Sequence, residues 1–313
     1  MADQMTADAE QLHGGHTDLD YRETADWGDF QGTPSNVLLF GDPECGPFAF
    51  FSSSAPMEEK MPTGFAHGHA SDNWRISVRG TTDMGRDSYA HGQFRFHDGG
   101  APYPGDNLAW GPDGGFGLVL FGDRRGFAIQ PVKAEIREQV RRSQEQAAAR
   151  LGIDMLDRCP DAPAIATTEG TTRRAHLNSG FDAAASWPEA APGVRLFVGL
   201  MGERERGPVV CLVDAAPGTV ALPARTLATE TLLLPVGGSV GAGGETLDQG
   251  SIRLEHADVA AAPLVAGDAG VQLVAIVGDR RALAAALDTG ALAAGDLATA
   301  LASSLTDLSA QLT

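Results

Sequence analysis

Two histidines, His67 and His69, are separated by a single residue in a β-prone stretch of the chain. In a β-strand, side chains two positions apart point to the same face, so both imidazoles are expected on one side of the strand. Two imidazoles on one face are the beginning of a site for a borderline transition metal. A His-x-His pair is common by chance, and the alternative is that both are surface histidines of a β-hairpin.

The residues around the two histidines resemble the first motif of the cupin family. In that motif a glycine precedes His-x-His, an acidic residue follows three or four positions later, and a glycine closes a pair of strands. This sequence has Gly64 before the histidines, Asn73 at the acidic position and Gly80 at the closing position. The spacing after the histidines matches, whereas an amide replaces the carboxylate and Gly64 lies closer to the histidines than is usual.

A modified form of the second cupin motif follows. In the family this motif reads Gly, five residues, Pro-x-Gly, two residues, His, three residues, Asn. Here it begins at Gly92, has Asp98 where Pro is expected, keeps the glycine at Gly100, and places Tyr103 at the histidine and Asn107 at the asparagine. The resemblance extends over residues 36–130.

The resemblance implies a divalent transition metal (Fe, Mn, Ni, Cu or Zn) held by His67 and His69 and by at least one further ligand. Tyr103 stands at the position of the third histidine, and a phenolate can bind such a metal or act as an acid or base beside it. His97, at the end of a β-prone run, is another candidate nitrogen ligand and proton carrier. Asn73 is a poorer ligand than Glu and is expected to support the site by hydrogen-bonding a ligand or a bound water.

The surrounding elements are mostly short strands. From residue 36 onward, β-prone runs alternate with Gly, Pro and Asp turns, which is typical of a sandwich or small barrel. Two runs carry Arg79 and Arg95 between apolar residues, and either arginine would clamp a substrate carboxylate if it faced the interior. Otherwise both lie on the outer face. Residues 131–151 predict a helix that Gly152 ends, and residues 158–193 are expected to form a connection.

The second half of the chain repeats the first at offsets of about 156 to 161 residues. Both copies contain a strand that ends in Gly-Asp-Arg-Arg. Aligning Trp74 with Thr231 places Ala224 and Thr226 opposite the two histidines. The second copy is therefore expected to keep the strand framework and to lack the metal ligands.

The sequence thus predicts an all-β fold of two tandem double-stranded β-helix (cupin) barrels with accessory helices. The expected divisions are an N-terminal arm (1–35), an N-terminal cupin barrel (36–130), a helix and linker (131–193), a degenerate C-terminal cupin barrel (194–282) and C-terminal helices (283–313).

Composition restricts the partners. The chain has 23 basic and 41 acidic residues among 313, a net charge of −18, which argues against nucleic acid or an anionic membrane surface. No apolar run approaches the roughly 20 residues that span a bilayer, and the N-terminal segment has no signal-peptide pattern. Three cysteines, Cys45, Cys159 and Cys211, are expected to be reduced thiols, which favours a cytoplasmic protein.

The leading functional hypothesis is a metal-dependent enzyme that acts on a small oxygenated metabolite in the N-terminal barrel. The resemblance leaves dioxygenase, isomerase and lyase reactions open, because fold does not select among them. The alternative is a bicupin that binds or senses a small molecule without turnover, which the missing Glu and third His favour. A homodimer is expected in either case.

Overall fold

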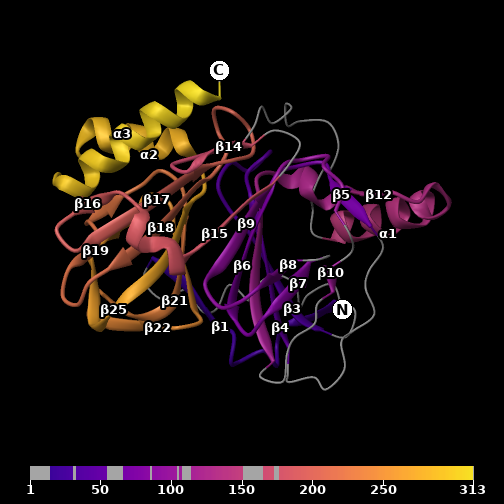
Figure 1. Ribbon diagram of the computed structural model, residues 1–313, viewed down its shortest axis with the longest axis horizontal. Coiled ribbons are helices and arrows are strands. Elements are labelled where there is room, and N and C mark those ends of the chain that lie inside the picture. Colours follow the sequence, from indigo (N-terminus) through magenta and orange to yellow (C-terminus); the bar gives the residue numbers. More distant parts are fainter. Residues whose placement is uncertain are drawn as a thin grey trace.

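The computed structural model describes residues 15–30, 33–54, 66–84, 87–103, 106–107, 114–150, 165–172 and 176–312. Two antiparallel β units lie side by side, the first coloured indigo to magenta and the second orange (Figure 1). Within this part of the chain, no helix is both long and apolar enough to cross a membrane. Cys45 and Cys211 are buried and form no disulfide within the described part of the chain, and Cys159 lies outside the described residues.

The first unit is built on a seven-stranded antiparallel sheet. In spatial order its strands are β15 (His176–Gly180), β9 (Gln93–His97), β6 (Asn73–Arg79), β11 (Gly115–Phe121), β4 (Phe48–Ser54), β3 (Thr33–Leu39) and β2 (Gly28–Phe30). Two small sheets accompany it, formed by β5 (His67–His69) with β12 (Ile129–Pro131) and by β10 (Asp106–Asn107), β7 (Thr82–Met84) and β8 (Asp87–Tyr89).

The second unit is built on an eleven-stranded sheet. Its main path runs β1 (His16–Asp20), β23 (Ser251–Glu255), β21 (Thr231–Ala242), β25 (Leu264–Val277), β18 (Val209–Ala215), β17 (Val194–Leu200), β13 (Ile165–Thr167) and β14 (Gly170–Thr172). Strands β16 (Glu189–Ala191), β19 (Val220–Leu222) and β22 (Glu245–Asp248) pair beside this path, and β20 (Arg225–Thr226) pairs with β24 (Ala260–Ala261).

Three α-helices accompany the strands among the described residues. They are α1 (Arg137–Arg150), α2 (Arg280–Thr289) and α3 (Asp296–Gln311), with short 3-10 turns at η2 (Arg124–Phe127), η3 (Ala134–Ile136) and η4 (Phe181–Ser186). The side chain of Asp279 caps α2 by accepting from the N–H of Arg281, and Gly290 ends it with φ +75°. Helices α2 and α3 bury leucines against the second unit, whereas α1 projects from the first (Figure 1).

The predicted duplication is confirmed by the topology. The strand order β9-β6-β11-β4-β3 in the first sheet matches β23-β21-β25-β18-β17 in the second. Landmarks at the strand ends match as well. Gly80 and Gly238 have φ of +73° and +70°, and Asp123 and Asp279 each accept a hydrogen bond from the N–H two residues further on.

The register of the predicted alignment was wrong by one residue. Asn73 pairs with His97 on one side, and Thr231 holds the matching place opposite Glu255. Thr231 is therefore equivalent to Asn73 rather than to Trp74. The second strand closes at the second of two adjacent glycines, because only that one has the positive φ the turn requires. The residues equivalent to His67 and His69 are accordingly Arg225 and Leu227, not Ala224 and Thr226.

The two units exchange strands. β1 precedes the first unit in sequence but pairs with β23 at the edge of the second, and β15 precedes the second unit but pairs with β9 of the first. Both strands lie between the units (Figure 1). The segments predicted as an arm and a linker thus supply sheet strands, which local sequence patterns do not reveal because the partners are distant.

An apolar core fills the space between the two sheets. Trp74, Phe94 and Phe96 of the first sheet meet Phe197 of the second, and all four side chains are fully buried. The ring centroids of Phe94 and Phe197 are 5.3 Å apart in an edge-to-face arrangement. Burying each ring contributes about 2 to 3 kcal/mol, so this layer fixes the relative position of the units.

Two equivalent pairs of glycines lie where the backbones of the units approach most closely. A Cβ at Gly202 would lie 2.3 Å from the carbonyl oxygen of Gly122, and a Cβ at Gly41 would lie 2.5 Å from that of Gly278. Gly202 and Gly41 also have φ of +71° and +74°. Glycine is required at these positions for both space and conformation.

We expect Gly202→Ala to destabilise the protein by clearly more than Gly218→Ala. Both glycines have φ of +71°, so each substitution incurs about 1 to 2 kcal/mol of backbone strain. Only Gly202 adds a steric clash, because nothing lies within 4 Å of a Cβ at Gly218. Urea denaturation of both variants measures the difference. Equal losses of unfolding free energy would contradict the close approach of the two backbones.

Asp72 is a buried carboxyl group that joins the units. Its Oδ1 accepts a hydrogen bond from the N–H of Gly99 at 2.7 Å, and its Oδ2 accepts one from the N–H of Gly202 at 3.1 Å. Burial, helped by the nearby carboxylates of Asp98 and Asp123, raises the pKa of Asp72 to about 6 despite these two hydrogen bonds. The folded protein therefore holds this proton at a pH where the unfolded chain has released it.

The sign of the resulting pH dependence follows from linkage. Because the pKa of Asp72 is higher in the folded state, stability decreases as the pH rises from the unfolded value of 3.8 to about 6. Relative to Asp72→Asn, the wild type should lose up to about 3 kcal/mol of unfolding free energy across this window. Chemical denaturation at a series of pH values tests this, with the exposed Asp288→Asn as control. A pH-independent difference between wild type and Asp72→Asn would contradict it.

Candidate functional site

Strand β5 places the two histidines of the sequence motif. On one side it pairs with β12, and on the other the backbone of His67 exchanges two hydrogen bonds with Tyr103, at 3.0 and 2.9 Å. Both imidazoles point to the same side, as the alternation predicts, and their ring centroids are 5.1 Å apart. His69 and Tyr103 are buried, and His67 is half-buried. Gly64 of the motif lies outside the described residues.

Three side chains converge on the hydroxyl oxygen of Tyr103. The Nε2 atoms of His67 and His69 lie 3.0 and 2.9 Å from it, and Nη2 of Arg75 donates to it at 2.5 Å. The guanidinium carbon of Arg75 also lies 4.7 Å from the centre of the Tyr103 ring. A positive charge this close stabilises the phenolate form of the tyrosine.

The hydrogen-bond partners determine where the protons lie. Nδ1 of His69 is 2.7 Å from the carbonyl oxygen of Gly126, which can only accept, so Nδ1 carries the proton and Nε2 carries the lone pair. The Tyr103 hydroxyl therefore donates to His69. Because it has a single proton, the hydroxyl must accept from Nε2–H of His67 and from Arg75. Removing the Tyr103 proton would leave an anionic oxygen between the two imidazoles.

His97 is brought to the same place from β9. Its ring centroid is 4.8 Å from that of Tyr103, and its Nε2 donates to the carbonyl oxygen of Ala101 at 2.8 Å. Its Nδ1 is buried and makes no hydrogen bond to the described residues. This atom has its lone pair available for a ligand. The ring of His176, on the exchanged strand β15, stacks on His97 at 6.2 Å.

Asn73 supports the site through Arg75. Its Oδ1 accepts from Nε of Arg75 at 3.2 Å, while its buried Nδ2 has no partner in the described chain. The sequence reasoning missed Arg75, although strand alternation from Asn73 would have placed it on the same face. Of the two arginines proposed as clamps, Arg95 lies beside Arg75 on the adjacent strand. Arg79 instead lies over the ring of Tyr21.

Three of the site histidines, His69, His97 and His176, have lowered pKa values. Burial lowers the pKa of His69 well below its ordinary value and that of His97 to about 4, and the charge of Arg75 acts in the same direction. Burial and Arg95 lower the pKa of His176. Neutral imidazoles keep the lone pairs that a metal needs.

The second copy fills the equivalent positions differently. Arg225 stands where His67 does and Glu255 where His97 does. These two side chains form a doubly hydrogen-bonded ion pair at 3.0 and 2.5 Å. The positive charge that a metal would supply in the first unit is provided in the second by a guanidinium.

The donor set of the first unit fits a transition metal. Ligand atoms around such an ion, with bonds of about 2.0 to 2.2 Å, lie about 3 to 3.5 Å apart. The Tyr103 oxygen lies 3.0 and 2.9 Å from the Nε2 atoms of His67 and His69, close to this spacing. The ring of His97, whose buried Nδ1 has no partner among the described residues, lies 4.8 Å from that of Tyr103. The set lacks the carboxylate of the cupin motif, since Asn73 holds that position.

Removing the Tyr103 hydroxyl should destabilise the metal-free protein. In Tyr103→Phe, Arg75 and the two histidines lose a shared partner, at an expected cost of about 2 to 3 kcal/mol. Tyr89→Phe is the matched control, because that buried hydroxyl donates only to Asn178, at 3.1 Å, and its loss should cost about 1 kcal/mol. Denaturant unfolding in the presence of a chelator measures both. Similar small losses would show that the convergence on Tyr103 is not a stabilising feature.

No protein-family model matches the chain, and no curated protein matches it in sequence. Solved structures do resemble it in fold. A candidate dioxygenase from Nostoc punctiforme shares 10% identity over 84% of this chain and 82% of its own, with a TM-score of 0.51. Salicylate 1,2-dioxygenase from Pseudoaminobacter salicylatoxidans, solved as adducts with gentisate, shares 12% identity over 87% and 83%, with a TM-score of 0.49.

Oxalate decarboxylase from Bacillus subtilis shares 12% identity over 87% of this chain and 78% of its own, with a TM-score of 0.45. The likeness to the Nostoc protein, together with the duplicated sheets, shows that this chain has the cupin fold. The resemblance predicted from the two motifs is therefore confirmed at the level of the fold.

Proposed function

We propose that the protein is a metal-dependent enzyme whose site lies in the first unit and acts on a small oxygenated carboxylate. The observation that carries this proposal is the convergence of His67, His69 and Arg75 on the oxygen of Tyr103. No separate structural reason requires a buried imidazole, a half-buried imidazole and a guanidinium at one phenol. A ligand set in which the proton occupies the place of a metal accounts for all three.

His67, His69 and Tyr103 would hold a divalent transition metal, with Nδ1 of His97 as a further donor. Bound there, the metal would polarise a substrate carbonyl or, if redox-active, activate dioxygen. Arg75, which Asn73 contacts through its Oδ1, would stabilise the Tyr103 oxygen once its proton had left. The carbonyl oxygens of Gly126 and Ala101 fix the ring orientations of His69 and His97. Either Tyr103 or His97 would carry the proton that the substrate gains or loses.

The charge of the site favours an anionic substrate. Arg75 and Arg95 occupy neighbouring positions on paired strands, and of these Arg95 is ion-paired with Asp87. Both guanidiniums come from the sheet face that carries Asn73, so they stand on the side of the candidate ligands. A carboxylate would be attracted and oriented by the guanidiniums. For Arg95 this is one of the two alternatives that the sequence left open, and Arg75 takes the place that Arg79 would have had.

A second candidate is a bicupin that binds a small molecule without turnover. The specific observation in its favour is Asn73, whose neutral amide replaces the metal-binding carboxylate and instead contacts Arg75. A weakened metal site would leave the guanidinium of Arg75 to bind a carboxylate. Metal content separates the two candidates.

Elemental mass spectrometry on untagged protein, grown with Fe, Mn, Ni, Cu and Zn supplements, tests the proposal. The wild type should carry about one equivalent of one of these metals, and His67→Ala/His69→Ala should carry none. The control is His91→Ala/His256→Ala, which removes two histidines elsewhere, one bonded to Val78 and the other to Thr17. This control should keep the metal.

The outcomes distinguish the candidates. Metal that disappears only in the His67/His69 variant supports the enzyme and directs a substrate screen towards carboxylates. If the wild type contains no metal after supplementation, the enzyme proposal is contradicted. The second candidate, a protein that binds a small molecule without turnover, would then be favoured. Equal metal loss in both variants would place the metal elsewhere.

A further inference from the structure

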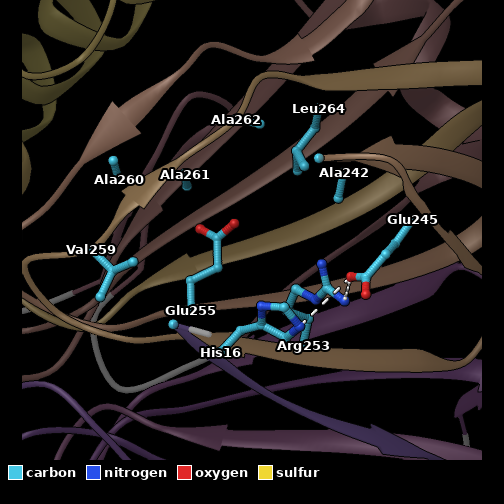
Figure 2. A pocket seen from close by; sticks show the side chains of 12 residues that line it. His16, Ala242, Glu245, Arg253, Glu255, Val259, Ala260, Ala261, Ala262 and Leu264 are labelled. Carbon is cyan, nitrogen blue, oxygen red and sulfur yellow. Dashed lines mark hydrogen bonds and ion pairs between the residues drawn. The ribbon is translucent and has the colours of Figure 1, made fainter. Parts of the chain in front are cut away.

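The second unit contains a cavity of its own. Its volume is about 310 Å³, which is enough for a small metabolite. Charged groups line one side and small apolar side chains the other (Figure 2). The lining residues are Gly15, His16, Ala242, Gly243, Glu245, Arg253, Glu255, Val259, Ala260, Ala261, Ala262 and Leu264. The cavity is distinct from the candidate metal site, none of whose residues belongs to it.

The duplication explains why there is space at this point. Arg225 pairs with Ala261 in the second copy as His67 pairs with Tyr103 in the first. Ala261 thus takes the place of Tyr103, and a methyl group replaces a phenol ring. The cavity occupies the position that the tyrosine fills in the first copy.

Arg253 offers a hydrogen-bond donor to this cavity. The side chain is buried, and its Nε and Nη2 atoms are bonded to Asp18 and Glu245. Its Nη1 makes no hydrogen bond to the described residues, and the guanidinium borders the open space (Figure 2). Nη1 would therefore bind an acceptor atom of a ligand. The Glu255 carboxylate, held by Arg225, lies in the same space.

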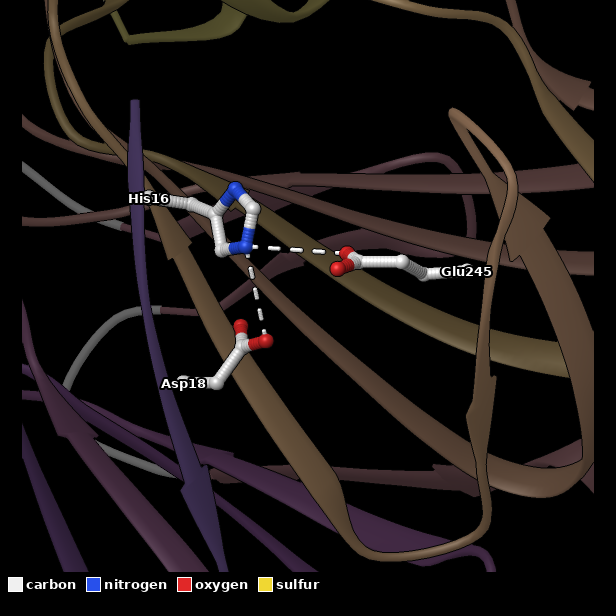
Figure 3. Close-up of side chains that lie close together, drawn as sticks. All are labelled: His16, Asp18 and Glu245. Atoms are coloured by element: carbon white, nitrogen blue, oxygen red, sulfur yellow. Dashed lines mark ion pairs between the residues drawn. The ribbon is translucent and has the colours of Figure 1, made fainter. Parts of the chain in front are cut away.

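A cluster of His16, Asp18 and Glu245 lies at the edge of the cavity (Figure 3). Nε2 of His16 is 3.5 Å from an Asp18 oxygen and 3.7 Å from a Glu245 oxygen. Both carboxylates are already bonded to Nη2 of Arg253 at 2.6 Å. A divalent ion here would have to displace both of these charge-assisted hydrogen bonds, which disfavours a metal.

We propose that this cavity binds a small zwitterion of the amino-acid class. The ligand carboxylate would accept from Nη1 of Arg253, and its ammonium group would face Glu255 and Glu245. An aliphatic side chain would pack against Leu264 and the alanines of β24. Three carboxylates around two arginines leave the cavity one negative charge in excess, which disfavours a simple anion. A simple amine would leave Nη1 of Arg253 without its acceptor.

Isothermal titration calorimetry with three matched probes tests this proposal. L-valine carries both charged groups, isobutylamine lacks the carboxylate, and isovalerate lacks the ammonium. L-valine should bind saturably, and each of the other probes should bind at least about tenfold more weakly, the loss of one charge-assisted contact. The metal-site variant His67→Ala/His69→Ala should bind L-valine as the wild type does, which separates this site from the proposed enzyme site.

Variants locate the binding. Ala261→Tyr restores the ring of the first copy and should abolish L-valine binding, whereas Val220→Tyr, on an exposed strand position, should leave it unchanged. If Ala261→Tyr does not fold, Glu245→Gln, whose side chain is 58% exposed, provides the test and should weaken binding at least threefold.

Several results would overturn the proposal. These are no saturable L-valine binding, equal binding of isobutylamine or isovalerate, and L-valine binding that survives the folded Ala261→Tyr variant. Saturable binding of Mn²⁺ alone that Glu245→Gln removes and His67→Ala/His69→Ala retains would replace the amino acid with a metal.

Discussion

The two faces of the first sheet meet different surroundings, and strand alternation keeps them apart. In β6, Trp74 and Ile76 enter the apolar layer between the units, while Asn73 and Arg75 face the candidate site. Moving the register by one residue would bury the guanidinium among aromatic rings and expose tryptophan to the polar site. The aromatic layer therefore holds the chemistry in place, although it touches none of the reacting groups.

One duplicated framework has been filled in two ways. Where the first copy has His67 and Tyr103, the second has Arg225 and Ala261. The buried guanidinium of Arg225 forms an ion pair with the carboxylate of Glu255. Buried charge must be compensated in either case. The imidazoles of the first copy are those that we propose as metal ligands. The second copy pairs its arginine with a carboxylate of the protein and leaves space beside it. This difference assigns separate roles to the two units.

The sequence predicted the parts of the fold that depend on short-range pattern. These include the common face of His67 and His69, the approach of Tyr103 to them and the duplicated strands. It did not predict the reciprocal exchange of β1 and β15, because those strands pair with partners far away in sequence. The sequence also did not show which of Gly237 and Gly238 closes the turn, because only the backbone conformation distinguishes them. Choosing Gly237 shifted the predicted alignment of this strand by one residue. Arg75 lies two positions after Asn73 in the same strand, so strand alternation predicts it on the same face, but it was not identified from the sequence.

In the metal-free protein, the proton on Tyr103 occupies the place that we assign to a metal. The lowered pKa of His69 means that this imidazole has no proton to release, so we assign the proton released on metal binding to the tyrosine. Calorimetric titration of the metal-free protein with Mn²⁺ or Zn²⁺, in buffers of different ionisation enthalpy at neutral pH, counts this proton. We predict release of about one proton by the wild type and close to none by Tyr103→Phe. Equal proton release by both proteins would contradict the account.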